Sequence, residues 1–169
     1  NATSALFGIY EAMVQYEYYG NEFLFLTNVN SGLMVTRRTG NNNKNSYNST
    51  LSSLNPTSGL VAIENSWIGI YQTIGRANDA INSATVFNNP STSDELVIND
   101  VIGQAYFVRA WSYLTLVRLW EDIPLWLELP DNENLNKPKT LAKDVYAQII
   151  ADAQTAASLI KGNTGTGYP

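Results

Sequence analysis

The 169-residue chain contains no cysteine and no histidine. Within these residues, that excludes disulfide bonds, thiolate or imidazole zinc ligands, cysteine nucleophiles and histidine-based catalytic triads. Charged residues make up only 15% of the chain, against a usual value of roughly 25%. The formal net charge is −5, which argues against a nucleic-acid partner, because binding phosphates requires cationic side chains. We expect no cofactor and no bound metal.

Long apolar runs are missing as well. The longest, residues 110–117, falls far short of the roughly 20 residues that a membrane-spanning helix needs. The first 20 residues lack the basic and apolar segments of a signal peptide. The chain starts without Met, and residues 161–169 have the composition of a linker. We therefore expect a segment of a longer protein.

Whereas charged residues are few, asparagine and tyrosine are abundant, with 20 and 10 residues. Their amide and phenol groups both donate and accept hydrogen bonds, which suits ligands rich in hydroxyl groups. The length is that of about one domain.

Apolar residues recur at steps of three and four along most of the chain, which predicts an all-α fold. Residues 105–120 are apolar on nearly every face, so the helix that contains them should form the core. We expect Thr92 with Glu95 to cap that helix and Thr140 to cap the next one. The expected helices span residues 4–19, 62–86, 93–120 and 141–161.

Residues 21–59 have no helical period. Phe23, Phe25 and residues 33–35 suggest short strands or extended segments, whereas residues 40–49 have the composition of a loop. We expect an irregular insertion of loop and short strands between the first two helices.

Acidic residues next to one another in the sequence are the candidates for acid–base chemistry. A glycosidase needs two carboxylates facing each other about 5 to 9.5 Å apart, and neighbours at helix ends rarely converge in this way. We therefore expect helix capping and solvation rather than a catalytic site. Residues 131–136 also lack the turn glycine of a calcium loop. The pairs are Asp94 with Glu95, Glu121 with Asp122, and Asp131 with Glu133.

One arginine and several aromatic residues stand out on the helices. Arg109 lies among apolar residues, and a buried arginine needs a carboxylate or carbonyl partner, so we expect a structural ion pair. Trp120 and Trp126 flank the end of the third helix, where we expect them to pack. Large aromatic residues on helical stripes are usually core residues. The expected core aromatics are Trp67, Trp111 and Tyr113.

Three segments resemble, in order, motifs of the SusD/RagB family. Residues 103–125 read GQAYFVRAWSYLTLVRLWEDIPL, similar to the family's Leu-Arg-Ala run followed by Leu-Val-Arg and Gly-Asp-Val-Pro-Leu, with Glu121 in place of the Gly. Residues 67–78, WIGIYQTIGRAN, and 144–153, DVYAQIIADA, resemble its Trp…Tyr…Ile-x-Arg-x-Asn and Val-Tyr-x-x-Ile-x-x-Asp-Leu helices. The matched motif residues are Trp67, Tyr71, Arg109, Trp111, Asp122 and Pro124.

The resemblance implies a tetratricopeptide-like fold of helix pairs, with the whole chain as the N-terminal part of a longer SusD-like domain. It implies a non-catalytic protein that binds glycans or other nutrients on the outer face of the Bacteroidetes outer membrane. The lipid anchor would lie outside this segment. The implied partner is a TonB-dependent, SusC-like transporter, on which such proteins sit as a lid.

The resemblance also places the expected ligand residues in the insertion. In this family, the N-terminal residues of the ligand site tend to lie between the first helix and the helix that begins with the Trp motif, which corresponds here to residues 21–59. Sugars stack on aromatic rings and hydrogen-bond to polar side chains. The candidates are Arg37, Arg38, Asn43, Tyr47 and Asn48.

Two other functions are kept open. The first is a tetratricopeptide-like scaffold that contacts the transporter, with ligand binding in a C-terminal half that is absent from this chain. The second is a glycosidase, which would require two converging carboxylates in a cleft.

Overall fold

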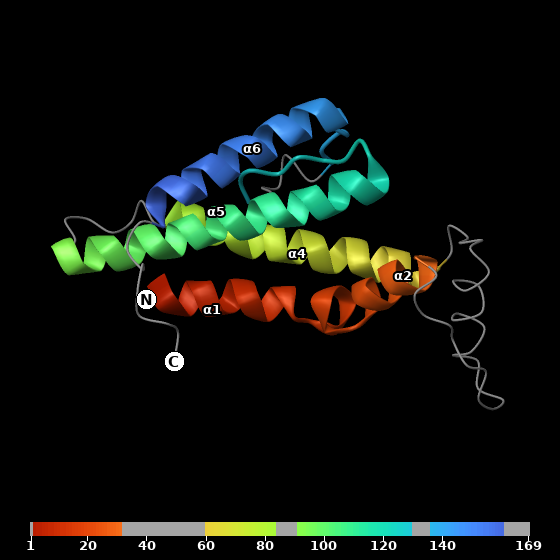
Figure 1. Ribbon diagram of the computed structural model, residues 1–169, viewed down its shortest axis with the longest axis horizontal. Helices are drawn as coiled ribbons and strands as arrows, with labels where there is room; N and C mark the ends of the chain where they lie inside the picture. The colour runs from red at the N-terminus through yellow and green to blue at the C-terminus, as the bar shows by residue number, and fades with distance from the viewer. Residues whose placement is uncertain (1, 32–59, 84–90, 130–135, 161–169) are drawn as a thin grey trace. The chain divides into compact units, whose positions relative to one another are not determined.

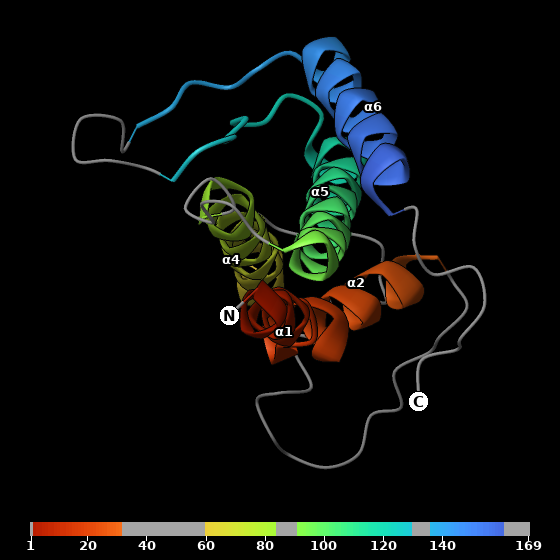
Figure 2. The same ribbon diagram turned by 90° about the vertical axis from the view of Figure 1, so that its left-hand side faces the viewer.

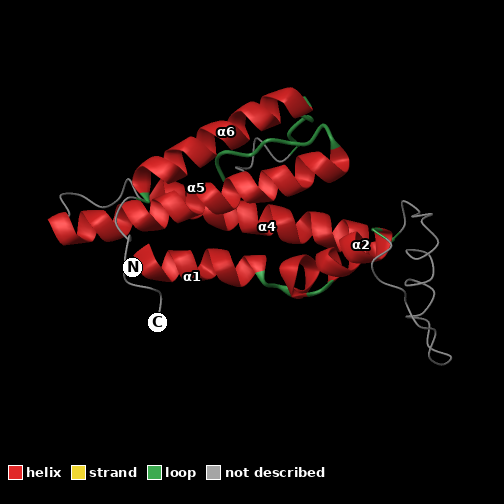
Figure 3. Cartoon of the chain, viewed as in Figure 1, coloured by secondary structure: helices red, strands yellow, loops and turns green. Residues whose placement is uncertain are grey.

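The computed structural model describes residues 2–31, 60–83, 91–129 and 136–160. Over these ranges the regular structure is helical, apart from a single β-bridge between Ile123 and Thr140, and residues 121–129 and 136–141 are otherwise loop (Figures 1 and 3). The predicted all-α class is confirmed. None of the helices in these ranges has the length and hydropathy to cross a membrane. The elements are α1 (Ala2–Met13), η1 (Tyr16–Gly20), α2 (Glu22–Asn30), α4 (Val61–Ser83), α5 (Thr92–Trp120) and α6 (Ala142–Leu159).

The chain divides into two compact units. The larger consists of Asn1–Ala12 and Tyr71–Pro169, and the smaller of Met13–Ile70. The boundaries therefore fall inside α1 and α4.

The smaller unit corrects two expectations. The helix expected over residues 4–19 ends at Met13 and is followed by the π-helical turn η1. That turn buries Tyr18, whose ring packs edge-on against Phe23. It also brings Gly20 so close to the carbonyl oxygens of residues 14 and 15 that a Cβ would lie 2.6 Å from each, so only glycine fits.

The second correction concerns the expected strands, because Phe23 and Phe25 lie in the helix α2. The two-residue spacing of Phe23 and Phe25 suggested a strand, but the buried residues follow a helical step of three: Phe23, Leu26 and Val29. Leu26 and Val29 pack with Leu60 and Ala62 at the start of α4. The remainder of the expected insertion, residues 32–59, lies outside the described residues.

In the larger unit, α5 and α6 pack side by side (Figure 2). They run antiparallel, because Gly103 of α5 meets Ile160 while Arg109 pairs with Asp152. At Gly103 a Cβ would lie 2.6 Å from the Ile160 side chain, so glycine permits the close approach. Near the middle of α5, Gln104 accepts a hydrogen bond of 2.8 Å from the hydroxyl of Tyr10 in α1.

Helix α5 supplies much of the core, as expected. Its buried apolar residues follow one broad side of the helix. The opposite side is exposed, so the helix is not packed all round. The buried residues are Val101, Ala105, Val108, Ala110, Tyr113, Leu116 and Val117.

The cap of α5 differs from the expected one by a single residue. The helix begins at Thr92, and its N-cap is Ser91, whose hydroxyl accepts a hydrogen bond from the backbone N–H of Asp94. Ser91 also donates to the Asp94 carboxylate at 2.6 Å. The expected capping box of Thr92 with Glu95 is therefore wrong, because Ser91 is the cap and the Asp94 carboxylate bonds to its hydroxyl.

Helix α5 ends at a strained residue. Glu121 has φ 59° and ψ −107°, a left-handed conformation that glycine adopts far more readily than any residue with a Cβ. The turn is thus as tight as a glycine turn, although a glutamate occupies it.

Replacing Glu121 with glycine should raise the free energy of unfolding by about 1 kcal/mol, because it relieves this strain. Urea denaturation followed by circular dichroism measures the change. Glu121→Ala is the matched control: it removes the carboxylate but keeps the Cβ, and should give no gain. Equal gains from both variants would show that charge, and not backbone strain, is responsible.

Candidate functional site

A buried ion pair joins α5 to α6. The Nε and Nη2 atoms of Arg109 donate hydrogen bonds to the two carboxylate oxygens of Asp152, and both distances are 2.7 Å. Both side chains are almost completely buried. This two-pronged geometry is the strongest arrangement of an arginine and a carboxylate. The expected structural ion pair of Arg109 is confirmed, and Asp152 is its partner.

Further polar groups complete this network. Nη1 of Arg109 donates to Oδ1 of Asn78 in α4 at 2.9 Å, and its guanidinium lies 5.0 Å from the ring centre of Tyr106. Gln148 donates to Asp152 at 2.8 Å. A buried charge is tolerated only where such partners replace the lost water, so the network ties α4, α5 and α6 into one register.

Side chains of α4 and α5 hold the chain that leaves α5 through hydrogen bonds to its backbone. Tyr71 of α4 donates to the carbonyl oxygen of Pro124 at 2.7 Å. Tyr113 of α5 donates to the carbonyl oxygen of Trp126 at 2.6 Å and accepts from its N–H at 2.7 Å. Asn78 donates to the same carbonyl at 3.0 Å. The segment 124–127, hereafter the exit loop, is thereby fixed against α4 and α5.

The two tyrosines are suited to this role. Burial raises the pKa of both Tyr71 and Tyr113 far above the ordinary phenol value, because the low-dielectric surroundings disfavour the charged phenolate. Each hydroxyl therefore keeps its proton and remains a donor to the exit loop.

Asp122 connects the end of α5 to the start of α6. Its Oδ1 accepts a hydrogen bond of 2.8 Å from the backbone N–H of Ala142, the first residue of α6. Backbone hydrogen bonds between Ile123 and Thr140 hold the two segments together. The expected cap, Thr140, is therefore wrong: the cap of α6 comes from Asp122, 20 positions earlier.

The aromatic residues divide into buried and exposed ones. Tyr113 is fully buried and confirms its expected place in the core, whereas Trp111 is 42% exposed, so its expected core position is wrong. The two residues point to different sides of α5, because two helical steps turn the side chain by about 200°. Trp67 and Trp120 are half-buried. Trp126 is also half-buried, with the ammonium of Lys137 5.0 Å from its ring centre.

The acidic residues do not assemble into a metal site in the described ranges, which hold no group of three acidic side chains suited to bind one. Asp122 caps α6, and the Asp94 carboxylate accepts a hydrogen bond from Ser91, the N-cap of α5. The pair Asp131 and Glu133 lies outside the described residues, as do all five expected ligand residues, Arg37, Arg38, Asn43, Tyr47 and Asn48.

The structure does bring together four of the six motif residues. Tyr71, Arg109, Asp122 and Pro124 all hold the exit loop or its surroundings. Sequence reasoning missed the part played by Asn78 and Asp152. Both lie inside the motif segments, and a polar residue on the apolar stripe of each helix was the available signal.

Arg109→Met should lower the free energy of unfolding by about 3–5 kcal/mol, because Asp152 is left buried without its partner. Arg118→Met is the matched control on the exposed side of α5, and should change stability by less than about 0.5 kcal/mol. Chemical denaturation measures both. The double variant Arg109→Met with Asp152→Leu should recover part of the loss, and equal losses for Arg109 and Arg118 would contradict the network.

Tyr113→Ala should cost about 3–5 kcal/mol, the range for an emptied aromatic site in a core. Trp111→Ala should cost about 1 kcal/mol or less, because so much of the ring is already in water. Thermal melts of the two variants in parallel give the comparison. A larger loss from Trp111 would place that ring in the core after all.

Comparison with known proteins assigns this chain to a family. A family profile described as "Starch-binding associating with outer membrane" matches residues 5–165. SusD-like protein P2 of Formosa agariphila is 42% identical over 92 residues, which are 53% of this chain and 17% of that protein.

Solved structures agree in fold. A SusD superfamily protein from Bacteroides thetaiotaomicron has a TM-score of 0.78 at 21% identity, over 99% of this chain and 38% of that one. A laminarin-binding SusD-like protein has a TM-score of 0.70 at 22% identity, over 94% and 33%. The chain thus spans less than two fifths of each of these proteins. Since the family profile covers nearly all of it, the chain belongs to the SusD-like family.

Proposed function

We propose that this chain is the N-terminal part of a non-catalytic cell-surface protein that binds a polysaccharide or oligosaccharide. The protein delivers its ligand to a TonB-dependent, SusC-like transporter in the outer membrane, to which a lipid anchor outside this segment holds it. The observation that carries the proposal is the match of residues 5–165 to a family described as starch-binding. The laminarin-binding relative has the same fold.

The geometry supports binding rather than catalysis. Three charged residues of the family motifs hold the fold: Arg109 pairs with Asp152, and Asp122 caps the start of α6. Such a network gives a rigid framework for the exit loop and the helices that flank it. A rigid framework that presents loops is the usual design of a binding site.

The ligand residues remain those expected from the sequence. We propose that Tyr47 stacks on a sugar ring, and that Arg37, Arg38, Asn43 and Asn48 hydrogen-bond to its hydroxyl groups. Support for this comes from their chemistry: an aromatic face matches the apolar C–H face of a sugar, and guanidinium and amide groups match its hydroxyls.

Affinity gel electrophoresis against a panel of polysaccharides, laminarin and starch included, tests the function. This chain and the longer SusD-like protein that we propose it comes from are run side by side. Retardation of both by one glycan places at least part of the site in this chain. Retardation of the longer protein alone favours the scaffold alternative. If neither is retarded by any glycan, the proposed function is wrong.

Tyr47→Ala should weaken glycan binding by about tenfold, the loss of roughly 1.4 kcal/mol of stacking. The thermal midpoint should stay within about 2 °C of the parent's, as for a surface substitution. Calorimetric titration with the retarding glycan measures the affinity. The matched control is Tyr16→Ala, which removes an exposed tyrosine in η1. Equal effects of the two variants would exclude a specific role for Tyr47.

A further inference from the structure

The backbone of Trp126 is held by two side chains, one from α4 and one from α5. Its carbonyl oxygen accepts hydrogen bonds from Tyr113 and Asn78, at 2.6 and 3.0 Å, and its N–H donates to the Tyr113 hydroxyl at 2.7 Å. The indole ring of Trp126, in contrast, is only half-buried, so part of this large apolar surface stays in water. The exit loop therefore holds a partly exposed aromatic ring in a fixed place.

A lysine lies over this ring because of the register of the two segments between α5 and α6. The antiparallel bridge joins Ile123 to Thr140, and three residues away from it on each segment are Trp126 and Lys137. Residues directly opposite each other in an antiparallel pair have their side chains on the same face. The ammonium of Lys137 accordingly lies 5.0 Å from the centre of the ring. Figure 2 shows the two segments, one leaving α5 and the other leading into α6.

Lys139 adds a second ammonium group to this face. Pro138 lies between the two lysines, and a proline favours an extended backbone for the residue before it. Residues two apart in an extended chain point to the same side. Both lysines are exposed, and in the described part of the chain neither is paired with a carboxylate. We call Trp126, Lys137 and Lys139 the exit-loop platform.

The chemistry of the exit-loop platform matches a ligand that has both an apolar face and a negative charge. The C–H groups of a sugar ring stack on an indole, and a carboxylate or sulfate group attracts ammonium groups. Two acidic residues lie next to the platform. Asp122 is engaged in capping α6, and Glu128 is exposed, where it can accept a hydrogen bond from a sugar hydroxyl.

We propose that the exit-loop platform binds an anionic saccharide unit, one that carries a carboxylate or a sulfate ester. Trp126 stacks on the sugar ring, and Lys137 and Lys139 bind the anionic group. The contact of the Lys137 ammonium with the ring is weak at an exposed site, so the anion replaces it at little cost. The inference rests on the proposed glycan binding and adds a second site, with a stated class of saccharide, to the residues between α2 and α4.

Calorimetric titration tests the site with three probes: oligogalacturonate, sulfated oligosaccharides of carrageenan and neutral laminarin oligosaccharides. This chain and the longer SusD-like protein are titrated in parallel. An anionic saccharide should bind about tenfold more tightly than the neutral one. Its affinity should fall several-fold between about 50 and about 300 mM salt, because salt screens exposed charges. The tighter of the two anionic probes identifies the group, carboxylate or sulfate.

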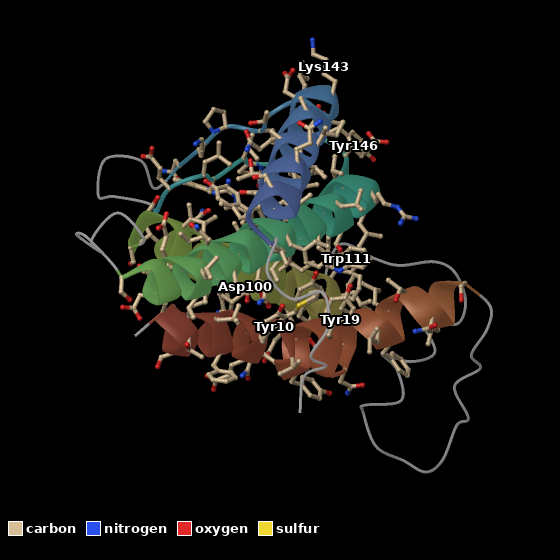
Figure 4. The ribbon with its side chains drawn as sticks, turned by 60° about the vertical axis from the view of Figure 1, so that its left-hand side comes forward. Tyr10, Tyr19, Asp100, Trp111, Lys143 and Tyr146 are labelled. Atoms are coloured by element: carbon tan, nitrogen blue, oxygen red, sulfur yellow. The ribbon has the colours of Figure 1, made fainter. Side chains whose placement is uncertain are left out.

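Lys137→Gln should weaken binding of the anionic saccharide by about fivefold, because it removes one of the two cations. The matched control is Lys143→Gln, which should change the affinity by less than about twofold. Lys143 is also exposed, but it projects outward from the start of α6 (Figure 4).

Trp126→Leu should weaken binding by about tenfold through the loss of stacking. Because the exit loop is held through backbone atoms that this variant keeps, the thermal midpoint should fall by no more than about 4 °C. Circular dichroism measures the midpoint.

Four outcomes would overturn the proposal. They are equal affinities for charged and neutral saccharides, equal losses from Lys137→Gln and Lys143→Gln, equally tight binding of polyglutamate, and binding to this chain that the longer protein lacks. Polyglutamate binding would mean a site for any polyanion, and loss in the longer protein would mean that the face is covered there. If laminarin or starch binds and no anionic saccharide does, the proposed function stands and this site is wrong. If no saccharide of any kind binds, both are wrong.

Discussion

The buried pairing of Arg109 with Asp152 is the interaction on which the arrangement of α4, α5 and α6 depends. A guanidinium among apolar side chains is very unfavourable unless every donor finds an acceptor. Here the acceptors come from three separate places: a carboxylate on α6, an amide on α4 and a carbonyl at the end of the exit loop. A shift of any one of them would leave a buried charge unsatisfied, so the network fixes their register.

The exit loop inherits its position from the same residues. Asn78 accepts from Arg109 and donates to Trp126, so a single amide joins the ion pair to the loop. Tyr71 and Tyr113 add their hydroxyls, which burial keeps protonated. Asp122 then caps the following helix. The polar residues of the family motifs thus act as a framework, and on our proposal ligand binding depends on the residues between α2 and α4.

Local patterns predicted some features of the fold and misjudged others. The predicted bounds of the three long helices lie within a few residues of the observed ones, because apolar residues that recur at steps of three and four indicate an amphipathic helix. The segment around Phe23 was misjudged because a short apolar run fits both a period of two and a step of three, and only burial of Leu26 and Val29 distinguishes them. The cap of α6 was missed because Asp122 is distant in sequence, whereas cap rules are local.

The sequence by itself determined the helical class, the family and the need of Arg109 for a buried partner, because each follows from residue type and spacing along one segment. Only the tertiary structure decided that the partner is Asp152, that Asn78 links it to the exit loop, and that Trp111 is turned to the outside of α5. These depend on how helices pack against one another. Amphipathic spacing shows which residues share a side of a helix, but packing decides which of those sides another helix covers.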